Sequence, residues 1–319
     1  LPQVRTVELL RSNLRRYPSV TCLTGVEFLR SQEAGNGVVA QCAWTSESPQ
    51  LFSTAPSPKL STLNPPPSAV LLRRTGQLST PLQISARYLV GCDGHRSQVR
   101  ASAGINAPER FYRQRFVMAD SEDHTGLGRE AHLFFNASTS IESFPLPGGK
   151  RRWIVLVDGQ DPSNPGGYII ERTRHLTGHH LHRRWLGDCS RFKPKRMLVN
   201  RYYSGRVLLA GDAAHVMSPI GGQGMNTGFA DAEFLAEMLF QVLSDPPLAD
   251  QWFPRYDQAR RHAFSTAARR AALGMWLGTR RGPVCSFLRR HFIRRVLFAP
   301  WMAPKLAPYF AMLTLPANA

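Results

Sequence analysis

The residues best suited to chemistry stand in a strand, turn and helix unit between positions 206 and 243. A buried strand, RVLLA, delivers Gly211 and Asp212 to its carboxyl end, where ligands of open α/β sheets bind. A carboxylate fixed there is suited to accept hydrogen bonds from sugar-alcohol hydroxyls, and the glycines that follow let backbone amides approach a ligand closely. The amino terminus of the next helix would favour developing negative charge. The pattern alone is equally compatible with an ordinary strand-to-helix connection in which Asp212 caps the helix.

A second turn with an acidic residue lies in VGCDGHRSQVR, residues 90–100. Asp93 and Gly94 follow a strand rich in bulky apolar residues and precede a short helix that contains Arg100. An Asp-Gly pair alone is a weak signal, because such dipeptides commonly mark hairpin turns.

Together the two units resemble the internal flavin motifs of FAD-dependent aromatic hydroxylases, the family that contains p-hydroxybenzoate hydroxylase and the ubiquinone-biosynthesis hydroxylases. The similarity in the later unit extends from RVLLAGDAAH through GQGMNTG to Asp231 in the helix. In that family the aspartate binds the ribityl chain of FAD, and the glycine-rich helix start faces the isoalloxazine. The Asp-Gly segment lies near the pyrophosphate and is also implicated in NAD(P)H use.

The resemblance therefore implies a cofactor site on this chain. Gln3 is included because relatives have a Gln or Arg at the start of a corresponding helix, although a plain surface glutamine is an equally good interpretation. The expected cofactor-binding residues are Gln3, Asp93, Gly94, Arg100, Gly211, Asp212, Pro219, Gly222, Gln223, Gly224, Met225 and Asn226.

The expected fold is α/β (α+β), with a Rossmann-like FAD-binding domain of the p-hydroxybenzoate hydroxylase type. Residues 1–108 and 196–257 are assigned to that domain, 109–195 to an interleaved antiparallel-sheet substrate domain, and 258–319 to a basic helical region. Residues 46–80, rich in Ser, Pro and Thr, are predicted to be a loop insertion. The family's G-x-G-x-x-G and its first βαβ unit are missing, so we expect the C-terminal two-thirds of such an enzyme, with about half of a flavin site.

The function implied by the resemblance is that of an FAD-dependent, NAD(P)H-using monooxygenase. It would hydroxylate an aromatic or polyketide-like substrate with O₂ through a flavin C4a-hydroperoxide. The antiparallel sheet would roof the substrate, with Phe134, Phe144 and Trp153 as candidate ring neighbours, although core packing explains each of them better. No catalytic residue is assigned, because packing or orientation explains His215 better than catalysis.

Two alternatives stay open. One is a related flavoprotein, such as a reductase or a halogenase, although the Gly-Gln-Gly-Met-Asn segment favours the monooxygenases and no Trp-x-Trp-x-Ile-Pro halogenase signature is present. The other is a non-catalytic truncated paralogue or gene fragment that is unable to retain FAD.

Charge adds one further expectation. The formal net charge is +18, and no acidic residue follows Asp257. This pattern fits a solvated face or an anionic partner, and nucleic acid is disfavoured because no recognition motif accompanies the charge. Residues 258–280 are expected to pack on the flavin domain, whereas residues 281–305 are the hypothetical site of peripheral membrane contact.

The remaining composition favours a cytoplasmic protein without a metal. No apolar run is long enough to span a membrane, and neither a signal peptide nor a Cys-x-x-Cys pair is present. His175 and His179 have metal-ligand spacing on a helix, but a solvated surface is the better interpretation because no carboxylate completes the site.

Overall fold

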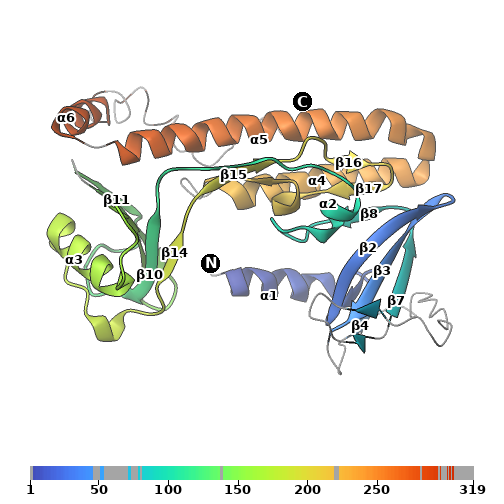
Figure 1. Cartoon of the computed structure of the whole chain (residues 1–319), viewed down its shortest axis with the longest axis horizontal. Coiled ribbons are helices and arrows are strands. Elements are labelled where there is room, and N and C mark those ends of the chain that lie inside the picture. Colours follow the sequence, from blue (N-terminus) through green and yellow to red (C-terminus); the bar gives the residue numbers. More distant parts are fainter. Residues whose placement is uncertain are drawn as a thin grey trace.

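The computed structural model describes residues 3–45, 51–53, 71–72, 78–79, 81–136, 139–218, 223–280 and 282–293, with residues 295, 300, 302 and 304. The fold is mixed α/β, with antiparallel sheets, a parallel strand pair and helices. A sheet covered by helix α3 (Pro165–Thr177) lies at one end and a hairpin sheet at the other, and the long helix α5 (Ala249–Thr279) runs between them (Figure 1). Most of the predicted insertion at 46–80 lies outside the described residues.

The amino-terminal part passes from a helix into a hairpin sheet. The hairpin turns at Gly35, whose φ of 55° lies in the left-handed region that favours glycine. Its elements are α1 (Gln3–Leu14), β2 (Val26–Ala34), β3 (Gly37–Trp44) and β7 (Pro81–Ala86), with short pairs of β1 (Thr21–Leu23) with β4 (Leu51–Ser53) and β5 (Leu71–Leu72) with β6 (Leu78–Ser79). The apolar residues of α1 are exposed.

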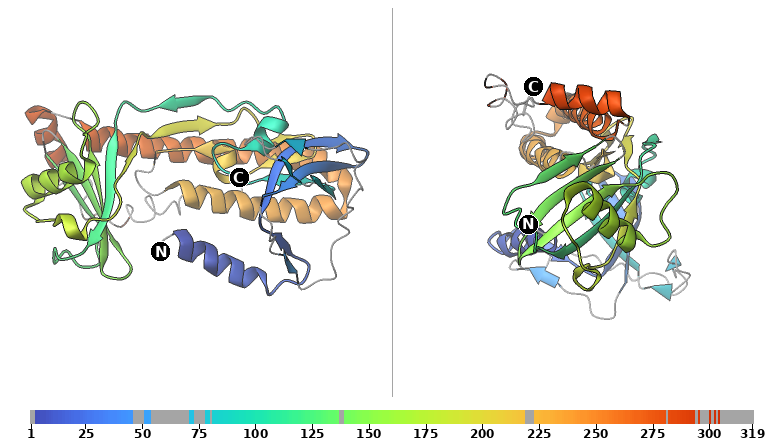
Figure 2. Two further views of the ribbon diagram at one scale, coloured as in Figure 1. Left: turned by 60° about the horizontal axis from the view of Figure 1, so that its bottom comes forward. Right: turned by 90° about the vertical axis from the view of Figure 1, so that its left-hand side faces the viewer.

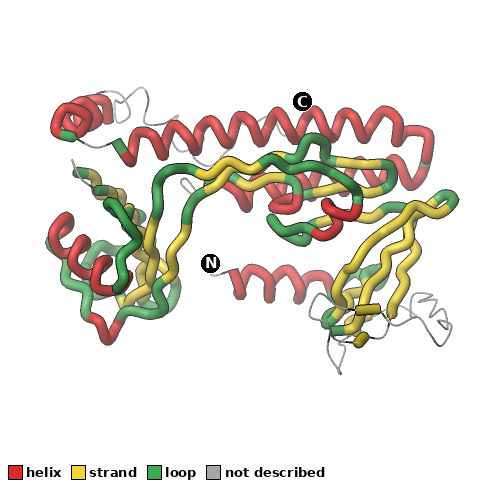
Figure 3. The backbone as a smooth tube through the Cα atoms, viewed as in Figure 1, coloured by secondary structure: helices red, strands yellow, loops and turns green. Residues whose placement is uncertain are grey.

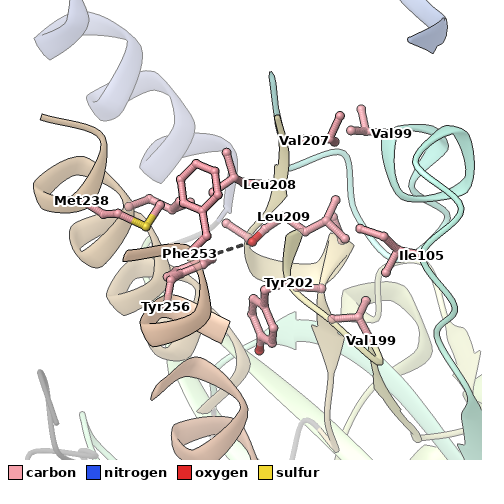
Figure 4. Packing of buried hydrophobic residues seen from close by; sticks show 14 of the residues in the cluster. Val99, Ile105, Val199, Tyr202, Val207, Leu208, Leu209, Met238, Phe253 and Tyr256 are labelled. Atoms are coloured by element: carbon pink, nitrogen blue, oxygen red, sulfur yellow. Dashed lines mark hydrogen bonds between the residues drawn. The ribbon is translucent and has the colours of Figure 1, made fainter. Parts of the chain in front are cut away.

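The central core surrounds two short parallel strands, β8 (Leu89–Gly91) and β17 (Val207–Leu209), with β16 (Tyr203–Ser204) antiparallel to β17. Strand β17 is entirely apolar and buried, as is typical of a strand covered on both faces. Figure 4 shows its Leu208 and Leu209 close to Met238 of α4 (Gln223–Ser244) and Phe253 of α5. The hydroxyl of Tyr256 donates a 2.8 Å hydrogen bond to the carbonyl of Leu209, which fixes α5 against the strand.

The antiparallel sheet at the opposite end has the strand order β11-β12-β13-β10-β14. Its strands are β10 (Phe116–Glu122), β11 (His132–Phe135), β12 (Ser140–Leu146), β13 (Lys150–Leu156) and β14 (Ser190–Phe192). The alternating apolar runs FVMAD, AHLFFNA, SIESFPL and RRWIVLVDG predict four strands, and β10, β11, β12 and β13 confirm them. The sequence of residues 162–195 predicts loop and helix, which is wrong for β14 because three residues are too few to show a period. The stacking of Phe192 on Phe116 at 5.4 Å helps hold this strand in place.

Paired strands carry the chain between the two ends of the molecule. β9 (Glu109–Phe111) and β15 (Lys195–Leu198) are antiparallel, and β18 (His215–Val216) pairs with the other edge of β15. Figure 3 shows these extended segments side by side between the core and the antiparallel sheet. The chain thus leaves the core after α2 (Gln98–Ser102) and returns beside its own exit, so the two halves of the core meet.

The carboxyl-terminal region contains two helices that are separated near a glycine and a proline. α5 ends at Thr279, and α6 (Pro283–Phe292) follows Gly282, whose φ is 97°. Three short 3₁₀ turns complete the described elements: η1 (Arg183–Trp185), η2 (Gly211–Ala213) and η3 (Pro246–Leu248). Among the helices of the described chain, we find none with the length and apolar character needed to cross a membrane.

Candidate functional site

The two sequence segments, residues 90–100 and 206–243, come together at the carboxyl ends of strands β8 and β17. β8 and β17 are parallel neighbours with Gly91 opposite Leu209, and the amide of Ala210 donates a 3.0 Å hydrogen bond to the carbonyl of Gly91. The turns that follow both strands therefore begin side by side, at the carboxyl ends of the strands. This edge is where an open α/β sheet binds ligands.

The turn after β17 holds Asp212 with its carboxylate open to solvent. Gly211 has a φ of 58°, and a Cβ at this residue would meet nothing within 4 Å. The amide of Gly211 donates a hydrogen bond to the carboxylate of Asp231 at 2.8 Å, which fixes the turn to α4. Asp212 is exposed, and its carboxylate forms no hydrogen bond or ion pair within the described chain. It is therefore free to accept hydrogen bonds from a ligand.

The carboxylate of Asp93, in the turn after β8, is used within the fold. It accepts hydrogen bonds from the hydroxyl of Ser97 and from the amides of Gln98 and Val99, at 2.7 and 3.1 Å for the two amides. The Ser97 hydroxyl in turn accepts from the amide of Arg100 at 2.9 Å. Asp93 thus stabilises the amino terminus of α2 directly, a role that the sequence did not predict. Gly94 beside it has a φ of 82°, which accounts for the glycine.

Arg100 links the two turns. Its guanidinium donates to the carbonyl of Ala213 at 2.8 Å and to the carbonyl of His95 at 2.9 Å. This side chain therefore locks the Asp93 turn against the Asp212 turn. Its observed contacts are structural, while the cofactor contact expected for it stays a prediction.

A buried charged cluster lies beneath the Asp212 turn. Asp231 accepts from Nε2 of His215 at 2.6 Å and from Nε of Arg260 at 2.7 Å, and the three side chains are at most 2% exposed. Burial alone would raise the pKa of Asp231, but the hydrogen bond and charge of His215, the charge of Arg260 and the amide of Gly211 outweigh it and hold the pKa below its ordinary value. His215 thus orients and packs, as the sequence analysis favoured.

Of the remaining predicted cofactor residues, Gln3 is the first residue of α1, and Gln223, Gly224, Met225 and Asn226 are the first four of α4. Pro219 and Gly222 lie outside the described residues, and the side chains of Gln3 and Gln223 are not described. Met225 and Asn226 are exposed on the first turn of α4, and a Cβ at Gly224 would meet nothing within 4 Å. The start of α4 therefore leaves room for a ligand to approach the backbone closely.

These observations fit one portion of an FAD molecule. An open carboxylate suits the ribityl hydroxyls, and the free space beside the backbone at Gly211 and Gly224 suits the close approach of a flat ring. The G-x-G-x-x-G expected to bind the pyrophosphate is not present in the sequence. The residues described here thus fit the ribityl chain and the flavin ring of the cofactor.

One face of the antiparallel sheet points toward the start of α4 (Figures 1 and 2). It lies between α3 and the amino-terminal ends of α1 and α4, in both Figure 1 and the left view of Figure 2. The α3 side holds Phe134 and Trp153, so both candidate ring neighbours belong to the packed core, as favoured. Phe144 is half-buried on the opposite face, opposite Arg152, which pairs with Asp120 at 2.7 and 3.0 Å.

Glu142, a residue that the sequence did not single out, lies on that opposite face. Its strand neighbours are Leu133 and Ile154, and it has no hydrogen-bond or ion-pair partner within the described residues. Burial raises the pKa of Glu142 from 4.5 to about 7. A signal was present in SIESFPL, where an acidic residue interrupts a strand next to apolar positions.

The other unpredicted feature is Arg260, which the sequence showed only as part of an arginine doublet. Its neighbour Arg261 instead donates to the carbonyls of Val199 and Asn200, both at 2.6 Å. Helical spacing from Tyr256 could have placed Arg260 on the inner face of α5. Among the residues that the structure describes, no group of three or more His, Cys, Asp or Glu could hold a metal ion.

Comparison with known proteins identifies a family domain that contains both the Asp93 turn and the Asp212 turn. A family model described as an FAD binding domain matches residues 67–271. The ubiquinone hydroxylase UbiL of Rhodospirillum rubrum is 33% identical over 215 residues, which cover 63% of this chain and 49% of that protein. The rifampicin monooxygenase of Streptomyces venezuelae is 33% identical over 171 residues, or 50% of this chain and 35% of that protein. The chain thus spans about half or less of the length of these relatives.

Solved structures extend the likeness to nearly the whole chain. OxyS anhydrotetracycline hydroxylase from Streptomyces rimosus aligns with a TM-score of 0.70 and 25% identity, covering 98% of this chain and 57% of that chain. The p-nitrophenol 4-monooxygenase of Pseudomonas putida aligns with a TM-score of 0.74, covering 98% of this chain and 72% of that chain. At 17% identity, the second comparison shows the fold alone.

Proposed function

The chain belongs to the FAD-binding domain family, and from that premise we propose that it forms the flavin-ring and substrate-sheet part of an FAD-dependent monooxygenase for aromatic or polyketide-like substrates. The observation that carries this proposal is the open carboxylate of Asp212, held at the carboxyl end of β17 and beside the turn that follows β8. Relatives named for hydroxylation or monooxygenation of ring compounds support the reaction class.

Different residues of this chain would contact different parts of FAD. Asp212 would bind the ribityl chain, and the backbone from Gly222 to Asn226 would approach the isoalloxazine. Asp93, Gly94 and Arg100 would act chiefly by fixing the two turns relative to one another. The dipole of α4, a helix of 22 residues, would favour negative charge on the ring near its amino terminus.

FAD, when bound, supplies the electron transfer and the activation of O₂, with NAD(P)H as the proposed reductant. The protein's part is to orient the ring to be hydroxylated and to keep water away from the reacting atoms. The open face of the antiparallel sheet would provide the apolar wall, with Phe144, Ile154 and Leu133 available to contact a ring. Glu142 is the polar group on this wall, suited to a hydroxyl or amine of the substrate.

Flavin binding is the direct test. Purified protein should be yellow or become yellow when FAD is added, and the added FAD should remain with the protein through gel filtration. A flavin-loaded sample should then oxidise NADH or NADPH faster when simple phenols are supplied as probes. Protein that stays colourless and ignores FAD would favour the non-catalytic fragment, whereas flavin reduction without ring hydroxylation would favour a reductase.

We also propose that the chain works in the cytoplasm, with a peripheral membrane contact through its basic carboxyl-terminal region. The support is the charge pattern: the 62 residues after Asp257 contain no acidic residue. Arginine-rich segments of this kind are attracted to anionic lipid surfaces.

A further inference from the structure

Helix α6 is oriented in an unusual way: its apolar face points outward. Val284, Phe287, Leu288 and Phe292 are spaced three, four and eight positions from the first, so they share one face. Their exposed fractions are 69%, 60%, 60% and 45%. A surface helix normally buries its apolar stripe and exposes its charges.

The inner face of α6 is held by an arginine. Arg289 is 5% exposed and donates to the carbonyl of Arg280 at 3.0 Å and to that of Asn136 at 2.6 Å. Its guanidinium also lies 5.1 Å from the ring centroid of Phe135. These contacts anchor α6 to the end of α5 and to β11, so the outward direction of the apolar face is fixed by specific bonds.

The last turns of α5 repeat this pattern. Leu273 and Trp276 are exposed by 59% and 52%, while Met275 between them is buried. Gly278 faces inward, where a Cβ would lie 3.2 Å from the ring of Phe135. The guanidinium of Arg280 lies over the Trp276 ring at 4.8 Å, so cationic and aromatic groups are adjacent on the outer surface.

Every Lys, Arg, Asp or Glu that the structure describes from Arg280 to Arg295 is an arginine. Arg280 precedes α6, Arg290 lies on it and Arg295 follows it, and all three are exposed. A second copy of the chain docked through α6 would bring these arginines near their counterparts, with no acidic residue beyond Asp257 to pair with them. An exposed apolar stripe flanked by cations complements an anionic lipid surface instead.

We propose that α6 is a membrane-docking helix: Val284, Phe287, Leu288 and Phe292 enter the interfacial layer of a bilayer that contains anionic lipids, and Arg280, Arg290 and Arg295 bind its headgroups. This proposal names the element and the partner behind the membrane contact put forward above. It does not depend on flavin chemistry, because the helix lies at the end of the molecule beside the antiparallel sheet (Figures 1 and 2).

Vesicle sedimentation with the whole chain tests the proposal. The protein should bind vesicles of phosphatidylcholine with about one-third phosphatidylserine, and salt should weaken the binding, whereas phosphatidylcholine alone should bind little. The double variant Phe287→Ser with Leu288→Ser should partition about tenfold more weakly or worse. Arg290→Glu should also weaken partitioning by about tenfold, since it reverses one headgroup contact.

Matched controls distinguish docking through α6 from non-specific adsorption to vesicles. Phe240 on α4 is 71% exposed, and Arg129 is an exposed arginine near the antiparallel sheet, so Phe240→Ser and Arg129→Glu should bind vesicles like the parent protein. Equal binding by the α6 variants and the parent would overturn the proposal, as would equal binding to neutral and anionic vesicles. A dimer in solution that the Phe287→Ser with Leu288→Ser variant abolishes would identify the face as a protein interface instead. FAD binding is measured separately on the same proteins, so loss of flavin does not count for or against docking.

Discussion

The turns after β8 and β17 look alike in sequence but use their carboxylates differently. Each follows a parallel strand at the same sheet edge, and each pairs an aspartate with a glycine in the left-handed region. Asp93 accepts three hydrogen bonds from its own helix, whereas Asp212 accepts none within the described chain. An acidic residue at a strand end therefore marks a ligand group only when its oxygens are not already used, and a sequence does not show that.

The charged cluster beneath the Asp212 turn should show the largest effect of substitution. We expect Asp231→Ala to cost about 3–5 kcal/mol of unfolding free energy, because it leaves the buried Arg260 without its anion and the Gly211 amide without an acceptor. Urea unfolding measures the loss. Glu233→Ala, an exposed acid on the same helix, is the control and should change stability little. A loss no greater than that of the control would mean that the cluster does not support the turn.

This difference between the turns also explains how far the sequence could go. The strand, turn and helix at 206–243 was predictable because apolar periodicity and glycine spacing are local signals. The Asp231–Arg260 pair joins residues from two helices, and Arg100 reaches the carbonyl of Ala213, 113 positions away. Such contacts depend on how elements pack, so no window of the sequence displays them. The outward face of α6 has the same origin, since its amphipathic pattern was visible but its direction was not.

Glu142 extends the comparison to a carboxyl that has no partner, like Asp212, but is buried. Its pKa is raised from 4.5 to about 7, so the folded state favours the neutral form. The contribution of Glu142 to the free energy of unfolding is then fully present below pH 4.5 and is lost as the pH rises through 7. Because each tenfold change in proton affinity is worth about 1.4 kcal/mol, the loss is roughly 3 kcal/mol at alkaline pH.

Glu142→Gln removes this titration. Its stability should equal that of the parent protein near pH 4.5 and exceed it by up to roughly 3 kcal/mol well above pH 7, measured by urea unfolding across the pH range. Glu130→Gln, which changes an exposed glutamate at the edge of the same domain, is the matched control for the substitution itself. A pH-independent stability difference between Glu142→Gln and the parent protein would show that the Glu142 carboxyl is hydrated.

Asp212→Ala tests the open carboxylate. We expect FAD affinity to fall by about tenfold to a hundredfold, since each hydrogen bond to a charged group is worth about 1.5–3 kcal/mol. The unfolding midpoint without FAD should not change, because the side chain has no partner in the described fold. Fluorescence titration with FAD measures the affinity, and Asp188→Ala, an exposed acid in the antiparallel-sheet domain, is the matched control. Unchanged affinity would remove Asp212 from the site.

Asp93→Ala should give the converse result and the smallest effect. Losing the acceptor for the amides of Gln98 and Val99 should lower stability by about 1 kcal/mol, the usual scale for a helix cap on an exposed turn. FAD affinity should fall less than in Asp212→Ala, because the loss comes through a loosened α2 and the Arg100 contact to Ala213 still holds the two turns together. Asp93→Asn, which keeps one acceptor oxygen, should recover part of the stability. If Asp93→Ala instead lowered FAD affinity as much as Asp212→Ala and left the unfolding midpoint unchanged, both carboxylates would be ligand groups, and the contrast drawn from their hydrogen bonds would be wrong.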